Sequence, residues 1–203
     1  YNRIIVLYSD RSSDKLLAET YRDLGDIYKT KQKFDDGIKV LNKALEIYSG
    51  LKDELEKSCN LNAIGGIYRI ATDLPNALKF MRMALAIQTA IEAVIDAANS
   101  LNNIGLIHGV QGRLRRAITI FRITLKLKRR VGDQFEIART LNNLGYAHQL
   151  CGDAEMALSF LKESLEINKR IGSKNEELHN LWNLSEIMMK SGNLREALIY
   201  VKD

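Results

Sequence analysis

The sequence predicts an all-α fold, a solenoid built from stacked antiparallel helix pairs. Residues 141–145 read Leu-Asn-Asn-Leu-Gly, and related pentapeptides stand at intervals of forty residues, at 21–25, 61–65, 101–105 and 181–185. A fixed period of this size is typical of one supersecondary unit that is stacked repeatedly. Within each unit apolar residues recur at spacings of three and four, which favours helices over strands.

Composition is compatible with one extended domain over residues 1–203. The chain has 203 residues, of which 46% are hydrophobic and 27% charged, enough to bury a long core. The apolar run at residues 4–7 is too short to cross a bilayer, so we expect no membrane insertion and a cytoplasmic location. The chain begins with Tyr1 rather than Met, and its two cysteines stand more than two repeats apart. From the first residue we expect the chain to be a piece of a larger protein. From the spacing of the cysteines we expect two free thiols rather than a disulfide bond.

The chain order of the repeats follows from the period. The predicted repeats are 14–53, 54–93, 94–133, 134–173 and 174–203, preceded at 1–13 by the end of an earlier repeat. Each repeat reads as two helices. In the first repeat Tyr21, Leu24 and Tyr28 form a stripe on one helix, and Ile38 and Leu41 continue a stripe on the next.

Turn and cap residues mark the predicted helix boundaries. Gly112, Gly152 and Gly192 share one repeat position between two helices, where a left-handed backbone needs no Cβ. Asp73 can cap the second helix of its repeat, and Pro75 falls in the first turn of that helix, where its missing N–H costs little.

Small residues predict close contact between the two helices of a repeat. They are Gly25, Gly65, Gly105 and Gly145 on the first helices, and Gly37, Ala77, Ala117, Ala157 and Ala197 on the second helices. We expect these residues to pack against each other rather than to bind a ligand.

The pattern resembles the tetratricopeptide repeat family. The residues that carry the resemblance in the third repeat are Leu101, Ile104, Gly105, His108, Ala117 and Phe121. The resemblance implies a right-handed superhelix. Two features depart from the family pattern: the unit has forty residues instead of about thirty-four, and the proline that closes the second helix is absent. The long unit is most similar to repeats of polarity and spindle-orientation adaptors, kinesin light chain and bacterial regulators.

The sequence contains no motif that predicts catalysis, and we expect no enzyme, cofactor or metal site. The glycines between 105 and 112 follow no strand and lack the Gly-Lys-Ser/Thr ending of a phosphate-binding loop. His108 and His148 occupy one repeat position, and we expect each ring to fill a gap between helices. One repeat of separation is too far for them to share a zinc ion.

Positive charge is concentrated in repeat 94–133, which carries a net charge of +6. Arg115, Arg122, Lys126 and Arg129 are spaced by seven, four and three residues and lie on one strip of the predicted helix, with Ile123 beside them. This possible second surface is either a solvated outer face or a contact for an acidic partner, a phosphate-bearing lipid surface or nucleic acid. Nucleic acid is the least favoured, because no aromatic residues interrupt the strip.

The family resemblance implies that the first helices line a concave groove. The candidate peptide-binding residues at the matching positions are Arg22, Lys29, Asn62, Arg69, Asn99, Asn102, Arg139, Asn142, Tyr146, Gln149, Trp182 and Met189. Asn62, Asn102 and Asn142 share one position, and their amides could bond the backbone of an extended peptide as a ladder. The alternative is that they bond within the solenoid.

Other groove positions would supply specificity. Arginines there would select acidic side chains, and Tyr146, Trp182 and Met189 would form an apolar pocket. Trp182 could instead be covered by a following repeat. The Lys/Asn/Lys/Arg set of the chaperone-binding family members is absent, so we do not expect recognition of a chaperone's C-terminus.

Three functions fit these features. The leading one is a scaffold or adaptor module that binds an extended or helical peptide of a partner protein, with acidic residues in the ligand. The second is a sensor segment of a larger signalling protein, such as a bacterial kinase or cyclase. The third is a structural role, in which open solenoid ends associate with each other.

Overall fold

The structure is a computed structural model that describes residues 11–202. Between these residues α-helices are joined by turns of two or three residues, and no strand is present. The all-α fold expected from the sequence is therefore confirmed. Over the same residues, no helix is both long and apolar enough to span a membrane.

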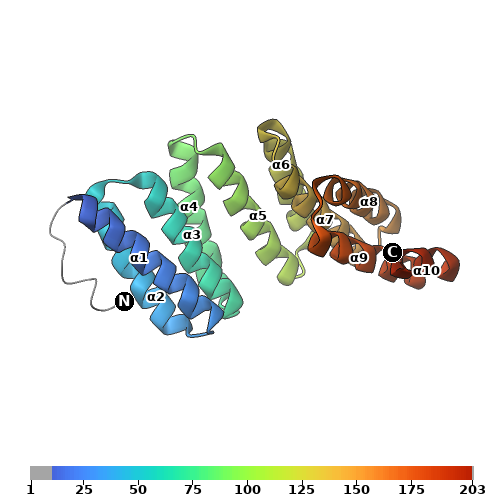
Figure 1. Cartoon of the computed structure of the whole chain (residues 1–203), viewed down its shortest axis with the longest axis horizontal. Helices are drawn as coiled ribbons and strands as arrows, with labels where there is room; N and C mark the ends of the chain where they lie inside the picture. Colours follow the sequence, from blue (N-terminus) through green and yellow to red (C-terminus); the bar gives the residue numbers. More distant parts are fainter. Residues whose placement is uncertain (1–10, 203) are drawn as a thin grey trace. The chain divides into compact units, whose positions relative to one another are not determined.

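The chain divides into two compact units, residues 1–103 and 104–203 (Figure 1). The first unit contains α1 (Arg11–Thr30), α2 (Phe34–Leu51), α3 (Glu54–Ile70), α4 (Leu74–Ala90) and the first part of α5 (Val94–Val110). The second unit contains the rest of α5, α6 (Leu114–Val131), α7 (Gln134–Leu150), α8 (Ala154–Ile171), α9 (Lys174–Lys190) and α10 (Leu194–Lys202). The expectation of one domain over 1–203 stays a prediction.

Within each unit the helices pack in the order of the chain. The pairs α1–α2 and α3–α4 in the first unit, and α7–α8 in the second, form the largest contacts. Smaller contacts join α2 to α3, α6 to α7, α8 to α9 and α9 to α10. The first helices of successive repeats touch as well, α1 against α3 and α7 against α9. This is the repeated stacking of a solenoid.

The predicted helix boundaries agree with the structure to within a few residues. Helix α1 begins at Arg11, three residues before the expected start, and the rest of the predicted preceding helix, residues 1–10, lies outside the described residues. Asp73 and Asp153 cap α4 and α8: each carboxylate accepts a bond of 3.2 Å from a backbone N–H three residues later. Gly112 has a φ of +69°, as the predicted turn requires.

Close approach of the paired helices explains the small residues. A Cβ at Gly105 of α5 would stand 2.6 Å from the Phe121 ring of α6, and one at Gly145 of α7 would stand 2.6 Å from Leu161 of α8. Ala117 of α6 is fully buried. A Cβ at either glycine would therefore force the Phe121 or Leu161 side chain to shift.

A column of buried polar side chains runs between each second helix and the next first helix. Its members on second helices are Tyr48, Gln88, Lys128 and Asn168, and those on first helices are Asn60, Ser100, Thr140 and Asn180. Buried polar atoms need partners, and several find them here: Ser100 donates to Gln88 over 2.6 Å, and Asn168 donates to Asn180 over 2.6 Å. The column therefore links neighbouring repeats by hydrogen bonds.

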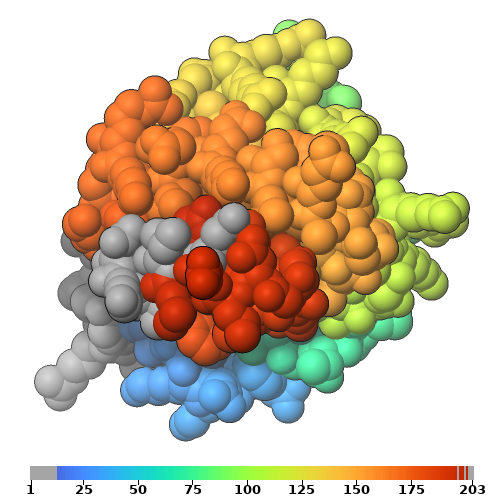
Figure 2. All heavy atoms as spheres, turned by 90° about the vertical axis from the view of Figure 1, so that its right-hand side faces the viewer, coloured from blue at the N-terminus to red at the C-terminus, as the bar shows by residue number. Residues whose placement is uncertain are grey.

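The end of the second unit presents apolar side chains. Leu194 and Leu198 of α10 are exposed, and Figure 2 shows this helix, in red, at the surface facing the viewer. Leu158, one period before Leu198, is half-buried against the core between α8 and α9. Association through such an end, expected from the sequence as one alternative, stays a prediction.

Candidate functional site

In the first unit, two of the three basic groove residues are paired with carboxylates. Arg22 of α1 forms an ion pair with Glu56 of α3, and Lys29 forms one with Asp26 on its own helix. Arg69 of α3 is half-buried. The charge that these residues could offer to an acidic ligand is thus partly neutralised within the unit.

The predicted asparagine ladder is engaged inside the solenoid. Asn62 donates to Ser100 of the next first helix, and Asn142 accepts bonds of 3.3 and 3.0 Å from Asn180 and Asn183 of α9. Asn102 is only 2% exposed. The expectation that all three amides face an open groove is therefore wrong for Asn102, and the other two are half-buried. For Asn142, the contact between α7 and α9 leaves the amide oxygen bonded to a neighbouring helix rather than free for a ligand.

Asn99 and Cys59, one period apart on the inner side, are also half-buried. The Cys59 thiol lies 3.8 Å from Oδ1 of Asp96, and burial, with Asp96 nearby, raises its pKa to about 11. Oδ1 of Asn99 is buried and has no hydrogen-bond partner among the described residues. This atom is one acceptor that a ligand donor could reach only after a side-chain movement.

In the second unit, Arg139 belongs to a three-membered charge network that sequence reasoning missed. Nη2 of Arg139 donates to Glu136 over 2.8 Å, and Glu136 also accepts a bond from Lys128 of α6. Lys128 is 4% exposed. Burial lowers the pKa of its ammonium group, while the hydrogen bond and charge of Glu136 oppose that shift.

A signal for this network was present in the sequence. Lys128 stands at the repeat position that Tyr48, Gln88 and Asn168 occupy in other repeats, where no residue carries a charge. Among the described residues, Glu136 is the one carboxylate that pairs with both Lys128 and Arg139, so the three residues together keep a net positive charge. Arg139 lies at the half-buried end of that network, on the inner side of α7.

Gln149 continues the polar edge of this face. Hydrogen bonds from Lys190 and Gln149 to the Glu186 carboxylate hold its pKa below the usual range, against the opposing effect of burial. Oε1 of Gln149 is buried without a hydrogen-bond partner among the described residues. Gln149 and Glu186 therefore join the ends of α7 and α9.

An exposed apolar patch lies on the same two helices. Tyr146 is 50% exposed, Trp182 71% and Met189 50%. Tyr146 follows Asn142 by four residues on α7, and Trp182 precedes Asn183, the hydrogen-bond donor to Asn142, on α9. Residues four apart share one helix face. The three side chains are thus exposed on two helices that contact each other, and the expectation that they form one pocket stays a prediction.

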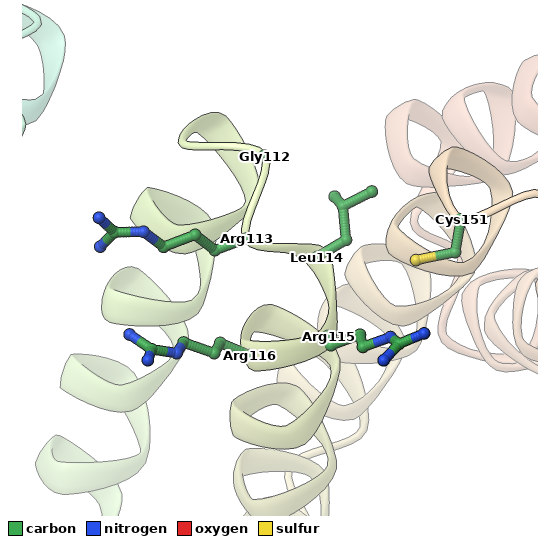
Figure 3. A pocket seen from close by; sticks show the side chains of 6 residues that line it. All are labelled: Gly112, Arg113, Leu114, Arg115, Arg116 and Cys151. Atoms are coloured by element: carbon green, nitrogen blue, oxygen red, sulfur yellow. The ribbon is translucent and has the colours of Figure 1, made fainter.

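The second predicted surface lies on α6. Its residues Arg115, Arg122, Ile123, Lys126 and Arg129 are all exposed. Arg129 forms an ion pair of 2.6 Å with Glu163 of α8. An open hollow of about 630 Å³ lies at the start of α6, lined by Gly112, Arg113, Leu114, Arg115, Arg116 and Cys151. In Figure 3, Arg115 extends toward Cys151, whereas Arg113 and Arg116 extend in the opposite direction.

His108 and His148 lie in the interior between helices, as expected. His108 and His148 are buried, and Nδ1 of His148 lies 3.1 Å from Asp153 while its ring packs on Phe160. In the part of the chain that the structure describes, no three His, Cys, Asp or Glu side chains are grouped to hold a metal ion.

Comparison with known proteins identifies the repeat. The sequence profile of the tetratricopeptide repeat matches residues 16–90, 96–170 and 136–203. No curated protein sequence matches the chain.

Solved structures share the fold at low sequence identity. BtubC (BKLC) from P. vanneervenii has a TM-score of 0.81 at 17% identity, with 95% of this chain and 87% of that chain covered. Aspartyl phosphate phosphatase F from Bacillus subtilis has a TM-score of 0.84 at 18% identity, with 94% and 50% covered. The Rap conjugation gene regulator of plasmid pLS20, in complex with the Phr* peptide, has a TM-score of 0.76 at 22% identity, with 98% and 55% covered.

The chain spans only part of some of these proteins. It covers 52% of a Rap protein complexed with competence and sporulation factor, and about half of the phosphatase. At such identities the likeness concerns the fold alone.

Proposed function

The chain belongs to the tetratricopeptide repeat family, and we propose that it is a scaffold module that binds a peptide segment of a partner protein on the inner face of α7 and α9. One observation supports this proposal: Trp182 exposes 71% of its surface on α9, a helix that contacts α7, and Tyr146 of α7 and Met189 of α9 are each 50% exposed. Large aromatic side chains left in water favour binding, because covering them contributes strongly to affinity. The Rap regulator of similar fold was solved with a peptide.

In this proposal the apolar patch receives one or two apolar side chains of the ligand. Arg139 and Gln149 lie on the same helix as Tyr146 and supply polar contacts at its border. The positive charge of the network of Lys128, Glu136 and Arg139 favours a ligand with an acidic residue at that end.

The asparagines have a smaller part than the sequence implied. Asn142 uses its oxygen to accept bonds from α9, and an amide keeps donors besides that acceptor. We therefore assign Asn142 to the border of the ligand site and Asn102 to the framework. Arg22, Lys29, Asn62, Arg69 and Asn99 would contribute the corresponding face of the first unit.

The proposal can be tested with peptides selected against the wild-type chain from a random display library. The selected peptide is then titrated by calorimetry into wild type, Trp182→Ala and Ile123→Ala. Trp182→Ala should weaken binding about thirty-fold, the effect of one central hot-spot residue. Ile123→Ala removes an apolar side chain that is 48% exposed from α6 and should leave the affinity unchanged.

The opposite pattern would contradict the proposed site on α7 and α9. If Trp182→Ala binds the peptide as wild type does while Ile123→Ala loses affinity, the peptide site lies on α6. Thermal melts of both variants establish that neither has unfolded, since each replaces a largely exposed residue.

A further inference from the structure

The outer face of α6 has a charge pattern that differs from an ordinary solvated helix. Helix α6 carries seven basic residues and no acidic one: Arg115, Arg116, Arg122, Lys126, Lys128, Arg129 and Arg130. Solvated helices usually intersperse both signs, because neighbouring like charges one turn apart repel each other. Arg113 takes the N-cap position of α6 without a side-chain cap, where α4 and α8 have Asp73 and Asp153.

Four of these residues form one straight strip. Arg115, Arg122, Lys126 and Arg129 fall within about 60° of the helix circumference and span about 21 Å of its length. Ile123, which is 48% exposed, lies beside the strip. We call these five residues the α6 strip. Its length equals about four helical turns.

The strip has little compensation from the rest of the unit. Over the described residues, Arg129 is the strip member for which an ion pair is formed, with Glu163 of α8 at 2.6 Å. Arg115, Arg122 and Lys126 are exposed. The Arg129–Glu163 pair shows that a carboxylate from a neighbouring helix can reach the strip and bond to it.

We propose that the α6 strip is a docking surface for an acidic amphipathic helix of a partner protein, separate from the peptide site on α7 and α9. Charge complementarity is the main argument, because a helix with carboxylates on one face and an apolar residue opposite Ile123 would match both features of the strip. A helix with its side chains is about 10 to 12 Å wide, so it can cover α6 alone.

Broader polyanions fit this surface less well. The neighbouring α8 exposes three glutamates against Lys162, Lys169 and Arg170, so it adds no net positive charge for a phosphate-bearing membrane or a nucleic acid laid across both helices. The aromatic residue of α6, Phe121, is buried and cannot stack on a base. A narrow acidic helix avoids both difficulties.

The probe is a synthetic helical peptide of about fifteen residues, with glutamates spaced to meet the strip and one leucine opposite Ile123. A matched peptide carries glutamine in place of each glutamate. Binding is measured by fluorescence anisotropy to wild type and to the Arg122→Glu/Lys126→Glu double variant. Wild type should prefer the glutamate peptide by at least about ten-fold, and the preference should fall as salt rises from about 50 to about 200 mM. The double variant should lose it.

Three controls make the outcome decisive. Lys162→Glu changes a basic residue on α8 and should not alter binding; Trp182→Ala should not alter it either, which separates this surface from the peptide site. Arg122→Gln with Lys126→Gln removes the charge without reversing it and replaces the double variant if that variant fails to fold. Equal binding of the two peptides, or tighter binding of single-stranded DNA or phosphatidylserine vesicles than of the glutamate peptide, would overturn the proposal.

Discussion

The side chains of Asn142 and Asn183 join the first helices of two successive repeats by a hydrogen bond of 3.0 Å. Asn180, on the same helix as Asn183, donates to Asn142 over 3.3 Å and accepts a bond of 2.6 Å from Asn168 of α8. Asn180 and Asn168 are buried. A chain of hydrogen-bonded amides therefore connects Asn168 of α8, through Asn180 of α9, to Asn142 of α7.

Replacing Asn142 should cost stability. Asn142→Ala removes the acceptor of two hydrogen bonds and leaves the buried Asn180 amide without one of its partners, so the free energy of unfolding should fall by about 1 to 3 kcal/mol. Urea unfolding measures this quantity. Asn175→Ala, at an exposed position near the start of α9, is the control and should stay within about 0.5 kcal/mol of wild type. Equal stability of the two variants would show that the amide set does not hold the repeats together.

This network shows what the repeat pattern could and could not predict. The forty-residue period places Asn62, Asn102 and Asn142 at one position of the first helix, and the structure agrees. The pattern does not contain the distance to the next first helix, which decides whether an amide meets solvent or a neighbour. Asn102 is 2% exposed, whereas Asn142 at the same repeat position is half-buried.

The turns and the charge network show a second reason why the sequence did not predict every local structure: the repeat can place a residue in an environment that its own type does not favour. Gln32 and Thr72 adopt φ values of 58° and 63° at the position where later repeats have glycine, because the repeat geometry imposes a left-handed residue whatever its side chain. Lys128 is buried because its position in the solenoid is buried, against the usual exposure of lysine. The exposure of Trp182 could not be predicted from its repeat position either, because Asn102 at the same position is 2% exposed and Trp182 is 71% exposed.

Two adjacent glycines of α3 should respond oppositely to alanine. A Cβ at Gly65 would stand 2.8 Å from Met81 and 3.2 Å from the carbonyl oxygen of Ala77, whereas a Cβ at Gly66 would meet nothing within 4 Å. Gly65→Ala should therefore destabilise the chain by about 1 to 3 kcal/mol. Gly66→Ala should stabilise it by about 0.5 to 1 kcal/mol, since alanine loses less backbone freedom in a helix.

Thermal or urea unfolding of both alanine variants gives the comparison directly. Because the two glycines share one helix and are neighbours in sequence, a difference in helix propensity cannot explain opposite signs. Two stabilised variants would mean that α3 and α4 can separate at no cost, contrary to the close packing at Gly65.

The two cysteines should differ in reactivity. Burial raises the pKa of the Cys59 thiol to about 11, so only about one thiol in a thousand is ionised at pH 8, and the thiolate is the reacting form. Cys151 is exposed. Iodoacetamide at pH 8 should modify Cys151 first, as followed by mass spectrometry of tryptic peptides. In Cys151→Ser, the remaining labelling should be slow and should accelerate about ten-fold per pH unit up to pH 10. Equal rates at the two cysteines would contradict the burial of Cys59.

The pair of Lys128 and Glu136 predicts a specific dependence of stability on pH. Burial lowers the pKa of Lys128 in the folded chain. The buried ammonium therefore destabilises the folded chain most at pH values below the folded pKa, and this destabilisation disappears as pH rises toward the unfolded pKa of about 10.4. Glu136→Gln removes the opposing charge and should cost about 3 kcal/mol at pH 7, because it leaves a buried ammonium unpaired.

That cost should shrink as pH rises from about 8 to about 10, since deprotonation of Lys128 then relieves it. Urea unfolding at each pH measures the difference between Glu136→Gln and wild type. The control places Glu136→Gln in a Lys128→Gln chain, which has the residue found naturally at position 88. Without the buried ammonium, the effect of Glu136→Gln should be small and independent of pH. If Glu136→Gln in the chain that keeps Lys128 destabilises the fold equally at every pH up to 10, Lys128 is not the group that the carboxylate stabilises.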